Sequence, residues 1–338
     1  MRPYFSVIIP TRKITTEIII ETLPALKKQS VKNFECLIVV DENSEIDKRL
    51  LSKYRFLKIV KNSDNTKPGL KRDFGAQKSK GQVLAFIDDD VSPQKNWLKN
   101  AKKIFESDKK IHLLGGPGIL PPKVNFWEKV FDVVLTSPLG SGPYTHRFKP
   151  EKSRYLDDYP SMNLMINKSV FIKNNGFGST YWPGEDSKML NKLIANENSL
   201  VLYDPSVSVY HHRRNTLKGY LKQHKNYGLT RGLFLSQGDK NSVKLTFIIP
   251  SLFVLYIILI PIFYLIGNSL LMNVYLLPLL IYLILLLSLF FHGLKLRRGA
   301  LTSLTAAIVL PLTHFIYGVY FLQAFLKDKL NFFRYKLI

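Results

Sequence analysis

The first 240 residues alternate short apolar runs with segments that mix charged and apolar positions. Residues 5–9, 35–40, 56–60 and 83–87 are nearly continuous in apolar side chains and predict buried strands. Between them, residues 15–29, 45–53 and 69–80 predict helices. Buried strands that alternate with helices are typical of a mostly parallel sheet covered on both faces. The pattern therefore predicts an α/β domain, with a less regular part from about residue 111 to residue 210.

The pattern changes near residue 244, where long apolar stretches begin. Residues 246–267, 270–291 and 301–326 contain no Asp, Glu, Lys or Arg. Each stretch reaches the roughly 20 apolar residues that a helix needs to cross a bilayer. We therefore expect a domain at residues 1–240 and an α-helical membrane region at residues 241–338.

The basic residues between these stretches predict the orientation in the membrane. Residues 292–299 join the second and third stretches and contain Lys295, Arg297 and Arg298, so this loop is expected in the cytoplasm. The same rule places the N-terminal domain in the cytoplasm, and the membrane is the plasma membrane if the source is prokaryotic. Three full spans would place the basic tail at residues 327–338 outside. The sequence leaves open a third segment that is re-entrant at Pro311 or a tail along the interface.

The formal charge of +23 limits the classes of partner. The chain has 48 basic and 25 acidic residues, and eight basic residues and one acid lie from Asn241 onward. A basic surface suits nucleic acid, an anionic membrane or phosphorylated substrates. No nucleic-acid-binding motif is present, and the membrane segments account for a basic surface, so we expect no nucleic acid partner. The single cysteine, Cys36, excludes a disulfide within the chain.

Three consecutive carboxylates, Asp88, Asp89 and Asp90, end the last predicted strand of the regular part. The carboxyl ends of strands in an open α/β sheet are where such sheets bind ligands. Carboxylates that crowd one strand end repel each other, so a cation or a basic partner must offset the cost. Mg²⁺ or Mn²⁺ held by one or two carboxylates and substrate phosphates would do so. A solvated acidic turn is the competing interpretation.

Other polar clusters are weak signals when each is taken alone. Asp41 and Glu42 follow a strand and suit a helix N-terminus, and Arg72 suits a solvated helix face. Glu185 and Asp186 open a predicted helix, where acids are ordinary stabilisers. The segment 211–214, His-His-Arg-Arg, suits either contact with a metal or diphosphate or a basic patch that faces a membrane.

The order of these clusters is more specific than any one of them. Residues 6–11, 35–44, 71–81, 88–90 and 184–186 together resemble family-2 glycosyltransferases of the GT-A fold, over roughly residues 4–235. The resemblance implies a Rossmann-like, mostly parallel mixed sheet that binds a nucleotide-diphosphate sugar. It implies a nucleotide-sugar half at about 1–118, an acceptor half at about 119–210 and an interfacial segment at about 211–240.

The same resemblance implies roles for individual residues. Asp88 would face the ribose and diphosphate, and Asp90, with Asp88, would bind the divalent cation. Asp186 would be the catalytic base, oriented by Glu185. The residues expected to border the nucleoside or donor are Pro10, Thr11, Asp41, Glu42 and Arg72. The family usually has Asp at the position of Glu42 and Asn at the position of Asp73.

The residues expected on the acceptor side rest on weaker matches. Asn163 falls on the family's acceptor-side strand, and Trp182 suits stacking on a sugar or isoprenoid, although a core aromatic is equally compatible. Gln223 and Tyr227 loosely match the Q-x-x-R-W motif of processive members, with Asn226 and Tyr227 in place of Arg and Trp. These departures argue against a processive synthase.

We therefore expect a membrane-anchored, inverting, metal-dependent, hexosyl-transferring enzyme. Its donor would be a UDP-, GDP- or dTDP-sugar, and its acceptor would be polyprenyl-linked or a growing polysaccharide. The alternatives are a non-catalytic nucleotide-binding membrane scaffold and a processive polysaccharide synthase.

Overall fold

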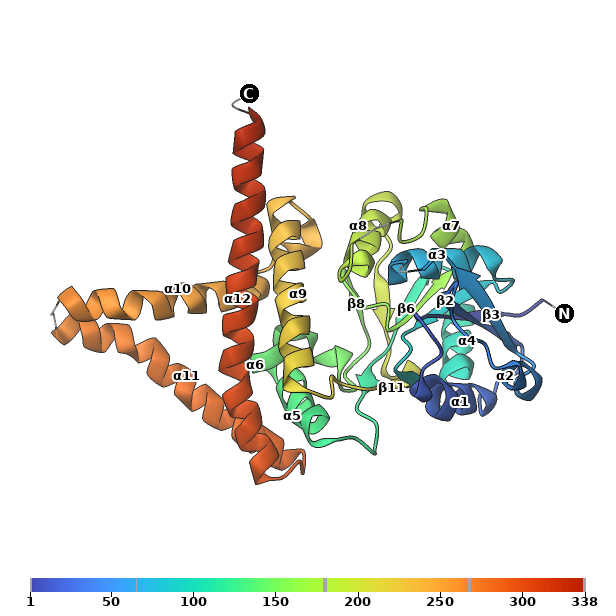
Figure 1. Ribbon diagram of the computed structural model, residues 1–338, viewed down its shortest axis with the longest axis horizontal. Coiled ribbons are helices and arrows are strands. Elements are labelled where there is room, and N and C mark those ends of the chain that lie inside the picture. Colours follow the sequence, from blue (N-terminus) through green and yellow to red (C-terminus); the bar gives the residue numbers. More distant parts are fainter. Residues whose placement is uncertain (1, 65, 179–180, 267–268, 337–338) are drawn as a thin grey trace. The chain divides into compact units, whose positions relative to one another are not determined.

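The computed structural model describes residues 2–64, 66–178, 181–266 and 269–336. The chain forms two compact units (Figure 1). Residues 1–121 and 146–212 form the first, which we call the sheet unit, and residues 122–145 and 213–338 form the second, which we call the helical unit. These units do not follow the predicted boundary at residue 240, because the segments 122–145 and 213–240 pack with the C-terminal helices.

An eight-stranded sheet forms the centre of the sheet unit, with the order β3-β2-β1-β4-β9-β6-β10-β8. The four strands of the regular part run parallel to one another, and β9 is antiparallel to both of its neighbours. The strands are β1 (Phe5–Pro10), β2 (Phe34–Asp41), β3 (Leu57–Asn62), β4 (Val83–Ile87), β6 (Leu113–Gly115), β8 (Arg154–Leu156), β9 (Asn163–Asn167) and β10 (Val201–Tyr203). The predicted mixed, mostly parallel sheet is confirmed.

Helices cover both faces of this sheet. The apolar side chains of one face pack on the π-helical turn Ile18–Thr22, α1 (Leu23–Lys27), α2 (Lys48–Lys53) and α4 (Trp97–Ser107). Those of the other face pack on α3 (Pro68–Lys78), α7 (Lys168–Lys173) and α8 (Glu185–Glu197). Neighbouring residues of β1 alternate between the two cores: Val7 and Ile9 belong to the first and Ile8 to the second. This period of two is what a strand buried on both faces requires.

A second, three-stranded sheet has the order β5-β11-β7. It consists of β5 (Val91–Pro93), β7 (Gly118–Ile119) and β11 (Val209–His211). Since β5 begins directly after the triple aspartate, this sheet brings a segment from residue 209 onward beside the acids.

The helical unit contains the three long apolar helices, α10 (Leu245–Ile266), α11 (Ser269–Lys295) and α12 (Ala300–Lys336). Each is long and apolar enough to cross a membrane. The predicted stretches lie within these helices, except for residue 267, which lies outside the described residues. The unit also contains α5 (Phe126–Leu135), α6 (Pro138–Ser141) and α9 (Leu217–Ser236). Apolar side chains of α5, α9, α11 and α12 form one core.

Candidate active site

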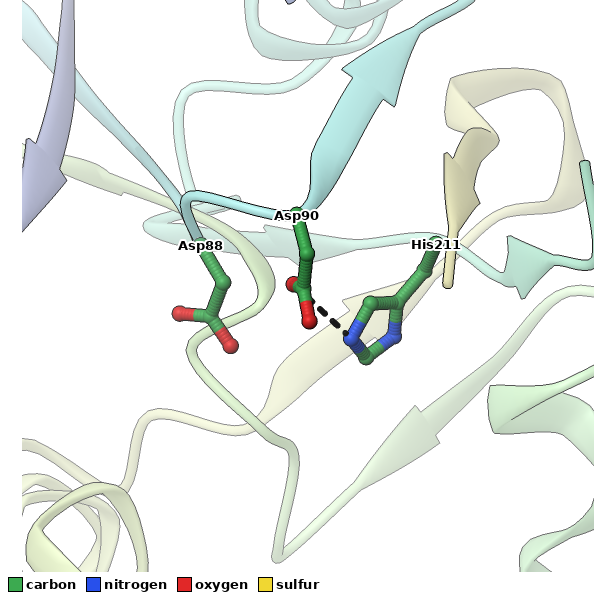
Figure 2. Close-up of side chains that lie close together, drawn as sticks. All are labelled: Asp88, Asp90 and His211. Atoms are coloured by element: carbon green, nitrogen blue, oxygen red, sulfur yellow. Dashed lines mark ion pairs between the residues drawn. The ribbon is translucent and has the colours of Figure 1, made fainter. Parts of the chain in front are cut away.

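The acidic cluster at the end of β4 includes a histidine from the other end of the sheet unit's sequence. In the small sheet, β11 pairs antiparallel with β5, and His211 lies opposite Val91. This pairing brings the His211 Nε2 atom to 3.3 Å from Asp90 Oδ1 (Figure 2). One potential ligand atom from each of Asp88, Asp90 and His211 lies within 4.8 Å of the others. Two carboxylates and an imidazole at this separation suit a divalent cation such as Mn²⁺.

Asp89 lies between the two candidate ligands but makes a different contact. Its Oδ2 atom accepts a hydrogen bond of 2.7 Å from the Thr11 hydroxyl, which ties the end of β4 to the end of β1. Burial, followed by repulsion from Asp90 and Asp88, raises the pKa of Asp89 to about 6. No role for Asp89 could be predicted from the sequence, whereas in the structure its carboxylate makes a contact that holds two strand ends together.

Arg72 on α3 connects the acidic cluster to the start of α8. The side chain is only 3% exposed, and it donates to Asp88 Oδ1 at 2.5 Å and to Glu185 Oε1 at 2.9 Å. One buried guanidinium therefore compensates two carboxylates that are more than 90 positions apart in the sequence. This arrangement fixes the position of Asp88, a residue of the candidate cation site.

Asp186 is held at the first turn of α8 by backbone donors. Its Oδ2 atom accepts the N–H of Ser161 at 3.2 Å, and its Oδ1 atom accepts the N–H of Ser187 at 2.8 Å. Burial and the neighbouring carboxylate of Asp158 raise the pKa of Asp186. Burial and the charge of Asp186 likewise raise the pKa of Glu185. A carboxyl group with a raised pKa is suited to accept a proton near neutral pH.

A buried lysine holds the residues expected beside the nucleoside. The Lys71 ammonium is 2% exposed and forms an ion pair with the Asp41 carboxylate. It also donates to the backbone carbonyl of Thr11. This contact joins the ends of β1 and β2, where Pro10 also lies. Glu42, one residue further on, is exposed.

Asp73, at the position where the family usually has Asn, binds two backbone N–H groups of the segment before α8. The Asp73 carboxylate accepts the backbone N–H groups of Phe177 at 2.8 Å and Gly178 at 2.9 Å. Burial raises the pKa of Asp73 in spite of these bonds. The side chain therefore anchors the segment that precedes α8 to α3.

The four acceptor-side residues have different surroundings. The Asn163 side chain is buried, donates to the carbonyls of Gly116 and Val207, and accepts from Trp97 Nε1. All three of these bonds hold the Asn163 amide inside the fold. Trp182 is half exposed. Gln223 and Tyr227 belong to α9 in the helical unit, where the amide of the first donates to the hydroxyl of the second.

The structure therefore brings together Asp88, Asp90, Arg72, Glu185 and His211 within the sheet unit. Sequence reasoning missed Lys71 and Asp158. Asp158 is buried, accepts from Ser187 Oγ at 2.8 Å and pairs with Arg147 at 3.2 Å. A basic residue directly before Arg72 was the available signal for Lys71, whereas no pattern around Asp158 distinguishes it from a surface acid.

Comparison with known proteins identifies the family. A model described as "Glycosyl transferase family 2" matches residues 6–173. The chain is 23% identical over 205 residues to a glucosyl-dolichyl phosphate glucuronosyltransferase of Haloferax volcanii, a match that covers 56% of this chain and 63% of the relative. It is 24% identical over 218 residues, 62% of this chain and 67% of the relative, to a Methanococcus voltae enzyme. That protein is named a dolichyl N-acetyl-alpha-D-glucosaminyl phosphate 3-beta-D-2,3-diacetamido-2,3-dideoxy-beta-D-glucuronosyltransferase.

Among solved structures, a mannosyltransferase from Pyrobaculum calidifontis in complex with GDP-Man and Mn²⁺ superposes with a TM-score of 0.49 at 15% identity. The superposition covers 68% of this chain and 62% of the other. The family assignment rests on the matched sequence model and not on this superposition. The chain therefore contains a domain of glycosyl transferase family 2, and long apolar helices follow this domain.

Proposed function

We propose that this enzyme is anchored in the membrane and transfers a hexosyl group, with inversion, from a nucleotide-diphosphate sugar to a lipid-linked acceptor. The observation that carries the proposal is the grouping of Asp88, Asp90 and His211 within 4.8 Å, with Arg72 linking this group to Glu185 beside Asp186. A cation site for a diphosphate and a candidate base therefore belong to one connected network.

Asp90 and His211, together with Asp88, are the residues that would hold Mn²⁺ or Mg²⁺. When bound, the cation stabilises the negative charge that develops on the departing diphosphate. Asp88 keeps its place through Arg72, and Asp90 lies on the segment that pairs with β11. His211 extends the two-carboxylate site that the sequence predicts by one nitrogen ligand.

Asp186 is the proposed general base. The acceptor hydroxyl oxygen bonds to the anomeric carbon, the bond from that carbon to the diphosphate oxygen breaks, and the hydroxyl proton passes to Asp186. Its raised pKa favours acceptance of this proton, and the two backbone N–H donors keep the carboxylate oriented. Attack opposite the leaving group gives inversion at the anomeric carbon.

The proposed acceptor is a polyprenyl-phosphate-linked sugar at the cytoplasmic face. Two relatives carry dolichyl phosphate in their names, and the three long apolar helices suit an acceptor that resides in the bilayer. The chain spans 63% of the first relative, so the donor is left open among UDP-, GDP- and dTDP-sugars. The departures at Asn226 and Tyr227 favour transfer of a single sugar over processive synthesis.

The test uses the full chain purified in lipid nanodiscs with Mn²⁺. A panel of nucleotide sugars is offered with polyprenyl-phosphate-linked acceptors, and products are weighed by mass spectrometry. Asp186→Asn should lower kcat by about 10²–10⁴-fold. Asp90→Asn and chelation should each abolish transfer, while Glu106→Gln, at an exposed carboxylate on α4, should have no effect. Full activity of Asp186→Asn would remove the base assignment, and nucleotide binding without turnover of any donor would favour the scaffold.

A further inference from the structure

The three apolar helices of the helical unit do not have equivalent surroundings. Figure 1 shows α10 and α11 converging away from α12, while α12 runs beside α9. In the apolar windows of α10 and α11, 11% and 6% of residues are buried, whereas 33% are buried in that of α12. The first two helices therefore form an exposed apolar hairpin, and the third is partly covered by other helices.

Contacts between α9 and α12 follow one another along both helices. In the middle of both helices, a Cβ on Gly228 would come to 2.5 Å from the Tyr317 carbonyl oxygen. One turn later, a Cβ on Gly232 would come to 2.2 Å from the Phe321 carbonyl oxygen. Near the end, Ser236 Oγ donates to Asp328 at 2.6 Å. The two helices thus run in the same direction in close backbone contact, with glycines where the backbones meet.

The chemistry of α9 excludes it from the hydrocarbon core. Its sequence contains four basic residues and no acidic residue: Lys218, Lys222, Lys225 and Arg231. The Lys225 ammonium lies 4.4 Å from the centre of the Tyr320 ring of α12. Charged side chains at the centre of a bilayer are costly and rare. Because α9 lies at the level of the headgroups or outside it, the part of α12 in contact with α9 lies there as well.

The first part of α12 is covered by a second charged helix. Asp132 of α5 is buried and pairs with Arg213 at 3.1 Å and with Arg298, just before α12, at 2.7 Å. Val130 and Phe131 of α5 share a core with Val309 and Leu310 of α12. Residues 300–312, which precede the part beside α9, measure only about 20 Å along the axis. This is shorter than the roughly 30 Å hydrocarbon core.

Unlike α12, the two helices of the hairpin have, within the described part of the chain, no charged helix packed along their apolar length. α10 has 22 residues and α11 has 27, which correspond to about 33 Å and about 40 Å. Between residues 245 and 294 the sequence contains no Asp, Glu, Lys or Arg. Exposed leucine and isoleucine side chains extend along both helices, among them Leu255, Leu259, Leu280 and Leu283.

We propose that the α10–α11 hairpin alone enters the bilayer, and that α12 lies with α9 in the plane of the cytoplasmic lipid headgroups. One face of α12 carries an apolar stripe at helical spacing that would contact lipid: Leu301, Leu304, Ile308, Leu312, Phe315, Leu326 and Leu330. The tail 327–338 overlaps the end of this stripe and has four basic residues in its sequence, which suit anionic headgroups. The basic loop at 295–298 and this tail then lie on one side, which removes the conflict between three spans and the positive charge of the tail.

The sidedness test uses single-cysteine variants in a Cys36→Ala background, since Cys36 is the only native cysteine. Lys295→Cys and Lys327→Cys, both at exposed positions, are treated with a membrane-impermeant maleimide in sealed vesicles of opposite orientation. Both should react from the same face. Reaction from opposite faces would show that α12 crosses the bilayer and would overturn the proposal. The unsubstituted background is the control for labelling.

A depth measurement gives an independent result on the same background. Nitroxides at Leu304 and Leu326 on α12 and at Val274 on α11 are compared by oxygen and nickel-chelate accessibility in vesicles of phosphatidylcholine and phosphatidylglycerol. Val274 is exposed and lies two turns before Tyr282, whose hydroxyl contacts His314 of α12. The two α12 positions should have similar, shallow depths, and Val274 should be deeper. An upright α12 would separate Leu304 and Leu326 by about 33 Å, and a separation near that value would overturn the proposal. An epitope appended after Ile338 and tested with protease in sealed vesicles checks sidedness without an internal substitution.

Discussion

Removal of the Arg72 guanidinium should destabilise the sheet unit in a manner that depends on pH. Arg72→Met keeps an unbranched side chain but leaves Glu185, which is 6% exposed, and the partly exposed Asp88 without their shared cation. Breaking a buried ion pair from one side costs about 3–5 kcal/mol, and we take about 3 kcal/mol because Asp88 is partly solvated. For a unit of this size, that cost lowers Tm by about 6–12 °C.

The sign of the pH dependence follows from Glu185. Its pKa in the folded chain is about 7 with Arg72 present, above the ordinary value of 4.5, because of burial and the charge of Asp186. This group therefore contributes stability below its unfolded pKa and loses it as pH rises through 7. Without Arg72 the carboxyl pKa rises further, so the variant should lose more stability at pH 8 than at pH 5.5.

The assay is thermal unfolding of the full chain in detergent at both pH values, monitored by tryptophan fluorescence. Arg49→Met is the matched control, because Arg49 is 91% exposed and pairs only locally with Asp47. An exposed pair of this kind contributes little to stability, because water and salt screen it. Equal Tm shifts for the two variants, or a shift for Arg72→Met that does not change with pH, would refute the reasoning.

Three further outcomes follow from the structure. Asp89→Asn keeps an oxygen that can accept the Thr11 hydroxyl and removes a buried carboxyl group whose pKa is raised to about 6. In metal-free buffer the variant should therefore be more stable at pH 8, by on the order of 2 kcal/mol, and its Tm should change little at pH 4. Gly232→Ala places a Cβ 2.2 Å from the Phe321 carbonyl oxygen and should destabilise the helical unit by about 1–3 kcal/mol, whereas an unchanged Tm would contradict the close packing. Lys71→Met releases Asp41 from its buried partner and should raise the donor KM more than it lowers kcat in steady-state kinetics, and the opposite split would contradict a donor-side position.

The elements of the regular part could be predicted because each one is defined by its own local pattern. The apolar run before Asp88 is a strand in the structure at residues 83–87, with the bounds that the pattern predicts. The same local reasoning could not find Arg72 between Asp88 and Glu185, because that contact depends on which helix faces which strand end. From a single sequence, an arginine on the exposed surface of a helix cannot be distinguished from an arginine that is buried between two carboxylates.

The hydrogen-bond partners of Asn163 could not be predicted from the sequence either. The family resemblance places Asn163 on the acceptor-side strand, and in the structure its amide pairs with two carbonyl groups and one indole N–H inside the fold. Buried polar groups need such partners, and the partners here come from residues 97, 116 and 207. Residues so far apart in the sequence are brought together by the order of the strands in the sheet, and this order cannot be predicted from the spacing of residues along the chain.

The excursion of residues 122–145 into the helical unit has a practical consequence for isolating the catalytic part. A fragment that ends before α10 would still carry α5, but without α11 and α12 to cover Val130, Phe131 and Val133. These side chains are buried in the full chain and would be exposed in the fragment, so the fragment would be prone to aggregation. A soluble fragment of the sheet unit therefore requires two changes: the chain ends after residue 212, and a short loop replaces residues 122–145. A fragment that is only shortened at its C-terminus should aggregate.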